Sequence, residues 1–316
     1  MINTSPLFYN YDQCKAYTRR WAKSFYFSSF LLPKEKRNAA YAVYTFCRYT
    51  DNLVDNSHDG GNIDMNVNSR FAHVYNYLDD VYSVANNHNY AFADTIEKFK
   101  IPKHYFTDLI DGVTMDITKK RYATFMELDS YCYKVASVVG LMMSEIFGYS
   151  SKSALPYAIY LGKAMQLTNI LRDVYEDYLM ERIYLPHDER KFFGYTEEDI
   201  GKKVTDGRFT DMMRFNVERN RAFYELAKHG IPYLTNDGSR TTAVLMYKIY
   251  SGILHEIEKY DYDIYSSRRY VSTVGKLRMT GSYFINLRER KRFASLPTEK
   301  HHERIRTFIP EMNFDV

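Results

Sequence analysis

The chain has 316 residues, enough for one large domain or two ordinary ones, and its 45% apolar content supports a sizeable core. The net charge of +4 is small and dispersed, which argues against nucleic acid as a partner but does not oppose a loose approach to an anionic membrane surface. No stretch approaches the about 18 apolar residues of a membrane-spanning helix, and no signal-peptide pattern opens the sequence. Cys14, Cys47 and Cys132 are too scattered for a disulfide framework or a zinc motif and fit a reducing compartment, so we expect a cytoplasmic protein.

Apolar residues recur at helical spacing along nearly the whole chain. Helices are expected from residue 12 onward and then over 34–55, 70–85, 90–99, 103–118, 126–147, 157–184, 211–229 and 241–260, with a last helix ending near 290. The remaining segments are expected to be a loose N-terminal arm (1–11), a mobile loop (56–69), an irregular charged excursion (185–201) and a charged tail (291–316). Because no segment alternates like a β-strand and no linker or repeat divides the chain, the prediction is a single all-α domain over 1–316.

A first ladder of polar residues lies in the sequence YAVYTFCRYTDNLVD, within the predicted helix 34–55. At about 100° per residue, Tyr44, Arg48, Asp51 and Asp55 fall within about 60° of one helix face. The other faces are mostly apolar, so this helix is expected to be largely buried. An aspartate pair four residues apart is, taken alone, more often a solvated acidic face.

A second ladder lies in AMQLTNILRDVYEDYLMERIYLP. Here Gln166, Asn169, Asp173 and Asp177 fall within about 80° of a helix whose other sides are apolar, with Arg172 at the edge. Buried carboxylates without a cationic partner would shift their pKa values or destabilise the fold. Carboxylate and amide oxygens are the ligands that Mg²⁺ prefers, above all when phosphate shares the ion. Two matched ladders therefore favour two facing helices with metal ions and phosphate oxygens between them.

Other polar pairs are less informative. Lys23 and Ser24 open a short helix or turn and could contact phosphate there, although a solvated lysine is the commoner case. Asp111 and Asp116 lie five residues apart and are poorly aligned on a helix, so we expect both to be solvated. The 31 tyrosines and 20 phenylalanines are mostly explained as core, but aromatic faces beside the ladders could stabilise a carbocation without trapping it.

Several common catalytic patterns are missing from the sequence. None of the nine histidines has metal-ligand spacing, and no Ser–His–Asp arrangement is suggested. The glycine-rich signatures of a dinucleotide fold and of a P-loop do not occur. Their absence argues only weakly against NADPH, which we nevertheless regard as an improbable cofactor.

The chain resembles the squalene/phytoene synthase family of head-to-head isoprenoid condensing enzymes. The segments that carry the resemblance extend over most of the chain: AKSFYFSSFLLP, YAVYTFCRYTDNLVD, LIDGVTMDI, YCYKVASVVGLM, QLTNILRDVYEDYLMERIYLP and YDIYSSRRYVST. The second-ladder segment ending in RIYLP is very specific, whereas the first DxxxD would be weak alone. Ser137 and Tyr175 depart from the family pattern at positions where glycine is usual or frequent.

The resemblance implies a helical bundle of the isoprenoid-synthase type around a central apolar cavity, with Mg²⁺, or Mn²⁺ in its place, as cofactor. It assigns metal binding to Asp51, Asp55, Asn169, Asp173 and Asp177, and catalysis to the four aspartates together with Tyr131. It assigns substrate and diphosphate contacts to Lys23, Ser24, Tyr44, Arg48, Gln166, Asn169, Arg172, Tyr250 and Arg269.

The implied reaction joins two prenyl diphosphates through a cyclopropyl intermediate. The RRYVST segment looks more like phytoene synthases, which favours two geranylgeranyl diphosphates condensed to phytoene through prephytoene diphosphate. The small Ser28 and Ser29 are expected on the tunnel wall, leaving room for a C20 tail. The alternatives are condensation of C15 farnesyl diphosphate to a dehydrosqualene- or squalene-type product, and a catalytically silent assembly partner. The oligomeric state stays open, and a peripheral membrane contact for product release is compatible with the sequence.

Overall fold

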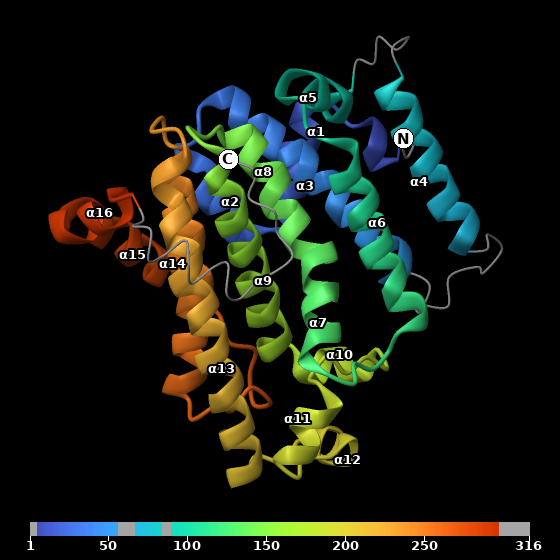
Figure 1. Ribbon diagram of the computed structural model, residues 1–316, viewed down its shortest axis with the longest axis vertical. Coiled ribbons are helices and arrows are strands. Elements are labelled where there is room, and N and C mark those ends of the chain that lie inside the picture. Colours follow the sequence, from blue (N-terminus) through green and yellow to red (C-terminus); the bar gives the residue numbers. More distant parts are fainter. Residues whose placement is uncertain (1–4, 56–66, 84–89, 297–316) are drawn as a thin grey trace.

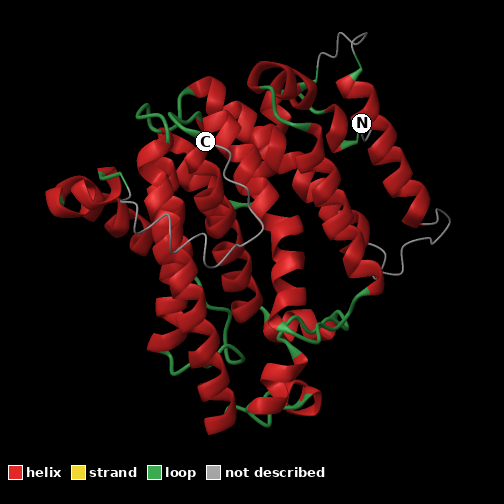
Figure 2. Ribbon diagram, viewed as in Figure 1, coloured by secondary structure: helices red, strands yellow, loops and turns green. Residues whose placement is uncertain are grey.

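The computed structural model describes residues 5–55, 67–83 and 90–296, with the side chains of residues 55, 67 and 68 left out. All regular structure in these ranges is helical, apart from two isolated β-bridges, which confirms the predicted all-α fold (Figure 2). The α-helices are α1 (Tyr11–Trp21), α2 (Lys23–Ser28), α3 (Lys34–Asp55), α4 (Val67–Tyr82), α5 (Ala91–Phe99), α6 (Lys103–Thr118), α7 (Phe125–Cys132), α8 (Val138–Phe147), α9 (Leu155–Arg172), α10 (Val174–Leu179), α11 (His187–Phe192), α12 (Glu197–Gly201), α13 (Gly207–Ala227), α14 (Ser239–Lys259), α15 (Thr273–Ile285) and α16 (Leu287–Ala294). In the described part of the chain, no helix is both long and apolar enough to cross a bilayer.

Two helices, α3 and α9, form the inner walls of the bundle (Figure 1). Helix α3 packs against α1, α5 and α6, and α9 packs against α13 and α14. Helix α8 contacts both α3 and α9 and so sets the separation of the two ladder-bearing helices. Helix α3 can lie at the centre because its inward face is small or apolar, including the fully buried Ala39, Ala40 and Val43.

The crossing of α9 with the chain before α8 is unusually close. A π-helical segment, η3 (Tyr133–Ser137), joins α7 to α8, and single π turns of this kind often occur at functional sites. A Cβ on Gly162 would lie 2.5 Å from the carbonyl oxygen of Ala136, so only glycine fits there. Ser137, where the family usually has glycine, is accommodated because its hydroxyl donates to the carbonyl of Ile159 at 2.9 Å.

Three expectations about the elements are wrong. The predicted helix 157–184 is interrupted at Asp173 and ends at Leu179, where bonds to residues three positions back tighten the last turn and Glu181 adopts a left-handed conformation (φ 61°). The arm 1–11 is not loose over its described part, because Leu7 is buried and its carbonyl accepts a hydrogen bond from Tyr77 at 2.7 Å. The segment 185–201 contains α11 and α12, the latter with a capping box between Thr196 and Asp199.

Two predicted helices are confirmed: the helix 34–55 agrees with α3, and the helix 126–147 agrees with α7, η3 and α8 taken together. The predicted loop and tail are only partly described. Most of the predicted loop 56–69 lies outside the described residues, and α4 begins at Val67. Of the predicted tail, residues 291–294 belong to α16 and residues 297–316 lie outside the described ranges.

The close crossing at Gly162 makes a testable prediction. Gly162→Ala should lower the free energy of unfolding by about 1–3 kcal/mol, because the added methyl group meets backbone that cannot move away. Gly281→Ala in α15 is the matched control, since a Cβ at that position would meet no atom within 4 Å and the change should stabilise the helix by up to about 1 kcal/mol. Thermal or denaturant unfolding of both variants measures the difference. Equal effects of the two substitutions would contradict the proposed steric role.

Candidate active site

A cavity of about 370 Å³ lies between α3, α8, α9 and α14. Its polar end is formed by Tyr44, Arg48 and Asp51 of α3 on one side and by Gln166 and Asn169 of α9 on the other. Parts of both ladders therefore reach the same cavity from different walls, whereas Arg172, Asp173 and Asp177 of the second ladder are not among the residues that line it. Tyr250 of α14 also lines the cavity, beside the polar residues of both walls.

The rest of the cavity wall is apolar or made of small residues. Val135, Val139 and Met143 line it from η3 and α8, and Leu161 and Met165 line it from α9. Among the described residues that line it, Arg48 and Asp51 alone carry a charge. The cavity thus combines a charged end with an apolar interior, the pattern of a site for an amphipathic ligand.

The expectation that Ser28 and Ser29 form the tunnel wall is wrong. Both side chains are fully buried, but neither lines the cavity. The chain turns after α2, so that the Ser29 hydroxyl faces α3 and lies 3.0 Å from the phenolic oxygen of Tyr41. Lys23 and Ser24 lie on α2 between Ala22 and Phe25, two residues that do line the cavity, and the Lys23 side chain is exposed.

In the first ladder, Asp51 is paired with an arginine of the same helix. Nη1 of Arg48 donates to Oδ2 of Asp51 at 2.6 Å, and the guanidinium carbon of Arg48 lies 5.7 Å from the ring centre of Trp21. Asp55 is the last residue of α3, and its side chain lies outside the described part of the structure.

Two arginines hold Asp173 in the second ladder. Arg268 donates from Nε to Oδ1 and from Nη2 to Oδ2, each at 2.8 Å, and Arg172 donates to the same two oxygens. Burial would raise the pKa of Asp173, but the hydrogen bonds and charges of the two guanidinium groups outweigh it and hold the pKa below its usual range. Asp173 is therefore ionised and neutralised by the protein itself.

Asp177, one turn further along, is in the opposite position. Burial raises the pKa of Asp177 well above its usual range, and the nearby negative charge of Asp173 raises it further, while Arg182 opposes the shift. Among the described residues no side chain donates a hydrogen bond to Asp177 or forms an ion pair with it. No three histidine, cysteine, aspartate or glutamate side chains of the described chain converge on one point. A divalent cation, with the rest of its coordination shell completed by oxygens of a bound ligand, would place positive charge beside the Asp177 carboxylate.

Arg268 reaches the second ladder, whereas Arg269, to which the resemblance assigns a substrate contact, does not contact it. The guanidinium group of Arg269 is turned away from Asp173: its Nε donates to the carbonyl of Asp263 at 2.6 Å, and it stacks on Tyr260. The two arginines lie in a stretch without regular secondary structure, and their guanidinium groups take different partners. The sequence analysis named Arg269 and did not single out Arg268.

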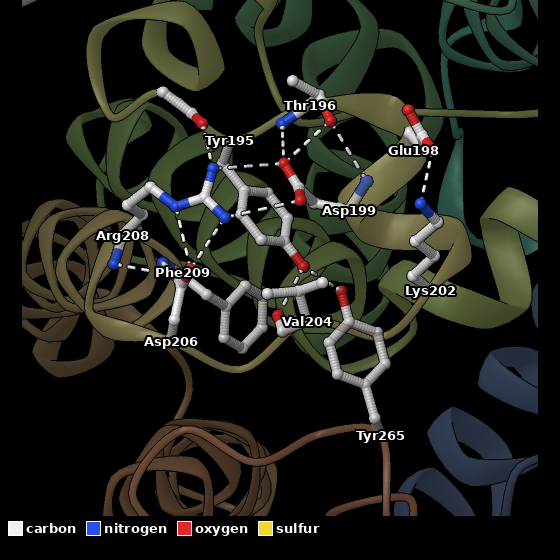
Figure 3. A network of polar contacts seen from close by, with 11 residues as sticks. Tyr195, Thr196, Glu198, Asp199, Lys202, Val204, Asp206, Arg208, Phe209 and Tyr265 are labelled. Carbon is white, nitrogen blue, oxygen red and sulfur yellow. Dashed lines mark hydrogen bonds and ion pairs between the residues drawn. The ribbon is translucent and has the colours of Figure 1, made fainter.

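A tyrosine contact anchors the loop that carries Arg268. The hydroxyl of Tyr265 lies 2.9 Å from that of Tyr195, within the polar network that also holds α12 to the start of α13 (Figure 3). The ring of Tyr265 meets the ring of Tyr175 edge-on, with 6.1 Å between their centres. Tyr175, the second departure from the family pattern, therefore packs against the loop opposite the second ladder.

Asp116 is buried, so the expectation that it is solvated is wrong. Its carboxylate accepts hydrogen bonds from the hydroxyls of Tyr131 at 2.8 Å and Tyr184 at 2.9 Å. Tyr131 lines the cavity, and burial raises its pKa well above the usual range, with further contributions from Tyr184 and Asp116. Asp111, on the same helix, is bonded at the surface to Tyr75 and Lys134, as a solvated carboxylate would be. No spacing rule would have paired Asp116 with Tyr184.

Comparison with known proteins agrees with this arrangement. The sequence model described as squalene/phytoene synthase matches residues 18–275. The chain is 38% identical over 283 residues to the 15-cis-phytoene synthase of Synechocystis sp., covering 84% of this chain and 82% of that protein. It is also 38% identical to the phytoene synthase of Arthrospira platensis, covering 85% and 90% of the two chains.

Solved structures show the same fold. A dehydrosqualene synthase in complex with ligand superposes with a TM-score of 0.79 at 28% identity, covering 88% of this chain and 96% of the other. The squalene synthase HpnC of Alicyclobacillus acidocaldarius superposes with a TM-score of 0.71 at 24% identity, covering 80% and 94%. The chain therefore belongs to the squalene/phytoene synthase family.

Proposed function

We propose that the chain condenses two molecules of geranylgeranyl diphosphate head to head to phytoene, through prephytoene diphosphate and with release of diphosphate. The observation that carries this proposal is an apolar cavity whose polar end combines Arg48 and Asp51 of the first ladder with Gln166 and Asn169 of the second. A prenyl diphosphate needs an apolar enclosure for its tail and cations for a head group of about three negative charges. The relatives with 38% identity that are named phytoene synthases support the C20 substrate.

The site residues fit a divalent metal ion, Mg²⁺ or Mn²⁺. Asp51 and Asp55 would hold it from α3, and Asn169, Asp173 and Asp177 from the opposite wall. The fit rests on Asp177, a half-buried carboxyl whose pKa is raised in spite of the nearby Arg182 and to which no side chain of the described residues donates a hydrogen bond. When bound, the ion would neutralise the charge that develops on the leaving diphosphate.

The chain's own residues would bind and shield the substrate. Arg48, Arg172 and Arg268 would grip diphosphate oxygens, because guanidinium groups bind such oxygens in pairs. The apolar wall would exclude water from the allylic cation, and the rings of Tyr44 and Tyr250 would face it without supplying a strong nucleophile. Asp116 would fix the position of the Tyr131 hydroxyl at the cavity wall. Lys23, Ser24 and Gln166 would complete the substrate contacts.

Two alternatives are weaker. The C15 condensation is supported by the structural likeness to a dehydrosqualene synthase, but at 28% identity rather than 38%. A silent assembly partner would have no use for the carboxylates that are present on both ladders. No feature of the site requires NADPH.

Incubation with geranylgeranyl or farnesyl diphosphate and Mg²⁺ should give a hydrocarbon mainly from the C20 substrate, and none in EDTA.

Asp177→Asn should lower turnover by several orders of magnitude. The same variant should unfold at a higher temperature than wild type in EDTA, because it removes a carboxyl group whose ionised form is disfavoured by burial and by the charge of Asp173. Asp211→Asn, at an exposed ion pair on α13, is the control. Full activity in EDTA, or a wild-type rate for Asp177→Asn, would refute the metal site.

Arg172→Lys tests whether the guanidinium group acts in the reaction or only neutralises Asp173. A contact that strengthens as the C–O bond breaks should lower kcat when it is lost, by about 10-fold or more, which corresponds to about 1.4 kcal/mol. Steady-state kinetics and a melting curve distinguish the two roles, with Arg214→Lys at the surface as control. A lower melting temperature with unchanged kcat would leave Arg172 with a structural role only.

Asp116→Asn tests the positioning of Tyr131. The amide can accept from one phenol but presents N–H groups to the other, so one of the two hydrogen bonds must be rebuilt. We expect kcat to fall about 10-fold or more with little change in KM. Asp111→Asn makes the same change at the exposed face of the same helix and should behave as wild type. A destabilised Asp116→Asn protein with wild-type kcat would exclude the positioning role.

A further inference from the structure

We propose that the outward face of α15 and α16 docks on an anionic lipid bilayer. This docking face consists of Val274, Leu277, Phe284 and Ile285 of α15 and Leu287 of α16. The proposal goes beyond the reaction proposed above, although the apolar product of that reaction gives it a purpose.

The docking face is apolar where a surface helix is normally polar. The exposed fractions are 74% for Val274, 58% for Leu277, 82% for Ile285 and 66% for Leu287. Positions 274, 277, 281, 284 and 285 fall within about 100° of the α15 surface, so these side chains form one stripe. Helix α15 packs against α14 through its other side, where Met279 approaches Gly252. The stripe is therefore turned away from the bundle.

The helices that carry this stripe are basic. The segment from Thr273 to Leu296 has six basic residues and one acidic residue, whereas the net charge of the whole chain is only +4. One of the six, Arg292, pairs with Glu225. The single acidic residue, Glu289, is engaged by Lys248 at 2.6 Å. Arg278 and Lys291 have no hydrogen-bond or ion-pair partner for their side chains within the described ranges. Arg278 precedes Ile285 by about two turns of α15, and Lys291 follows Leu287 by about one turn of α16.

The charge of the docking face favours an anionic membrane as its partner. A basic helix with an exposed apolar stripe matches an anionic membrane surface, where the stripe enters the boundary of the acyl chains and the cations meet head groups. A second copy of the chain docked through the same face would bring like charges together. The basic recess of about 730 Å³ between α14 and α15, lined by Lys259 and Arg278 among others, adds to the attraction for anionic head groups.

The position of the docking face suits the chemistry of the cavity. Helices α15 and α16 project from one side of the bundle (Figure 1) and pack against α14, whose residues Met246 and Tyr250 line the cavity. A single helix thus separates the docking face from the cavity wall. Substrates with long apolar tails and a hydrocarbon product would pass between that cavity and a bilayer.

Flotation with lipid vesicles tests the proposal. The protein should float with vesicles of phosphatidylcholine and phosphatidylglycerol, bind less to phosphatidylcholine alone, and be released from the anionic vesicles by salt. Leu277→Glu/Ile285→Glu should reduce binding at least 10-fold. Arg278→Gln/Lys291→Gln should reduce it about 25-fold on anionic vesicles, at about fivefold per cation.

Matched controls alter equally exposed residues elsewhere. Met126→Glu/Phe192→Glu changes side chains that are 76% and 82% exposed, and Lys202→Gln/Arg214→Gln removes two cations from other faces. Both controls should bind like wild type. Melting curves verify that each variant is folded, and Val274→Gln/Leu287→Gln replaces the first pair if that pair fails to fold.

Three results would overturn the proposal: wild-type protein that does not float with anionic vesicles, face variants that bind like wild type, or a wild-type dimer in solution that the face variants dissociate. The dimer would assign the face to a second copy. Turnover of substrate dispersed in detergent is measured in parallel, so that loss of vesicle binding and failure of the proposed reaction remain distinguishable.

Discussion

The structure depends on how its buried carboxylates are neutralised. Asp173 lies at the interruption between α9 and α10 and is gripped by Arg172 from its own helix and by Arg268 from a loop 95 residues away. Leaving such a carboxylate buried without a cation would cost several kcal/mol. The requirement explains why the loop before α15 is closely anchored, with Tyr265 bonded to Tyr195 and Asp263 accepting from the backbone N–H groups of Tyr265 and Ser266 at 3.0 Å. The loop positions a cation opposite the second ladder.

The cavity follows from a balance between close and open packing. Helices α8 and α9 cross with almost no side chain between them at Gly140 and Gly162, where a Cβ would lie 2.6 Å or less from a backbone atom of the partner segment. Helices α3 and α9 are kept apart on the ladder side by contacting α8 in turn. These close crossings fix the positions of the helices, so that the apolar cavity between them does not close.

Periodicity alone predicted much of this site. The 3.6-residue repeat placed Tyr44, Arg48 and Asp51 on one face of α3, and Gln166 and Asn169 on one face of α9, and all five line the cavity. Such a repeat reports which residues share a helix face, so it works wherever one helix supplies the residues. The all-α fold was predictable for the same reason.

What the repeat could not predict depends on contacts between distant segments. Asp116 was expected in solvent because nothing in its own helix predicts the two tyrosines that bury it, one of them 68 residues away. Ser29 was placed on the cavity wall because a small residue near the entry leaves space, but the turn after α2 directs it to Tyr41. The interruption of the second ladder helix at Asp173 gave no signal, because the flanking residues Arg172 and Val174 are compatible with continuous helix.

The proposed metal site rests on a difference between two neighbouring aspartates of the second ladder. Arg172 and Arg268 donate hydrogen bonds to Asp173, whereas Asp177, one turn away, receives no side-chain hydrogen bond in the described structure, and Arg182 only partly offsets the rise in its pKa. Another arginine at that point would stabilise the fold, but it would also fill the space in which an ion and a diphosphate oxygen could meet. A carboxyl group with a strongly raised pKa is a local cost to stability, and such costs persist where function requires them. This asymmetry between Asp173 and Asp177 is therefore the physical argument for the ion-binding site proposed above.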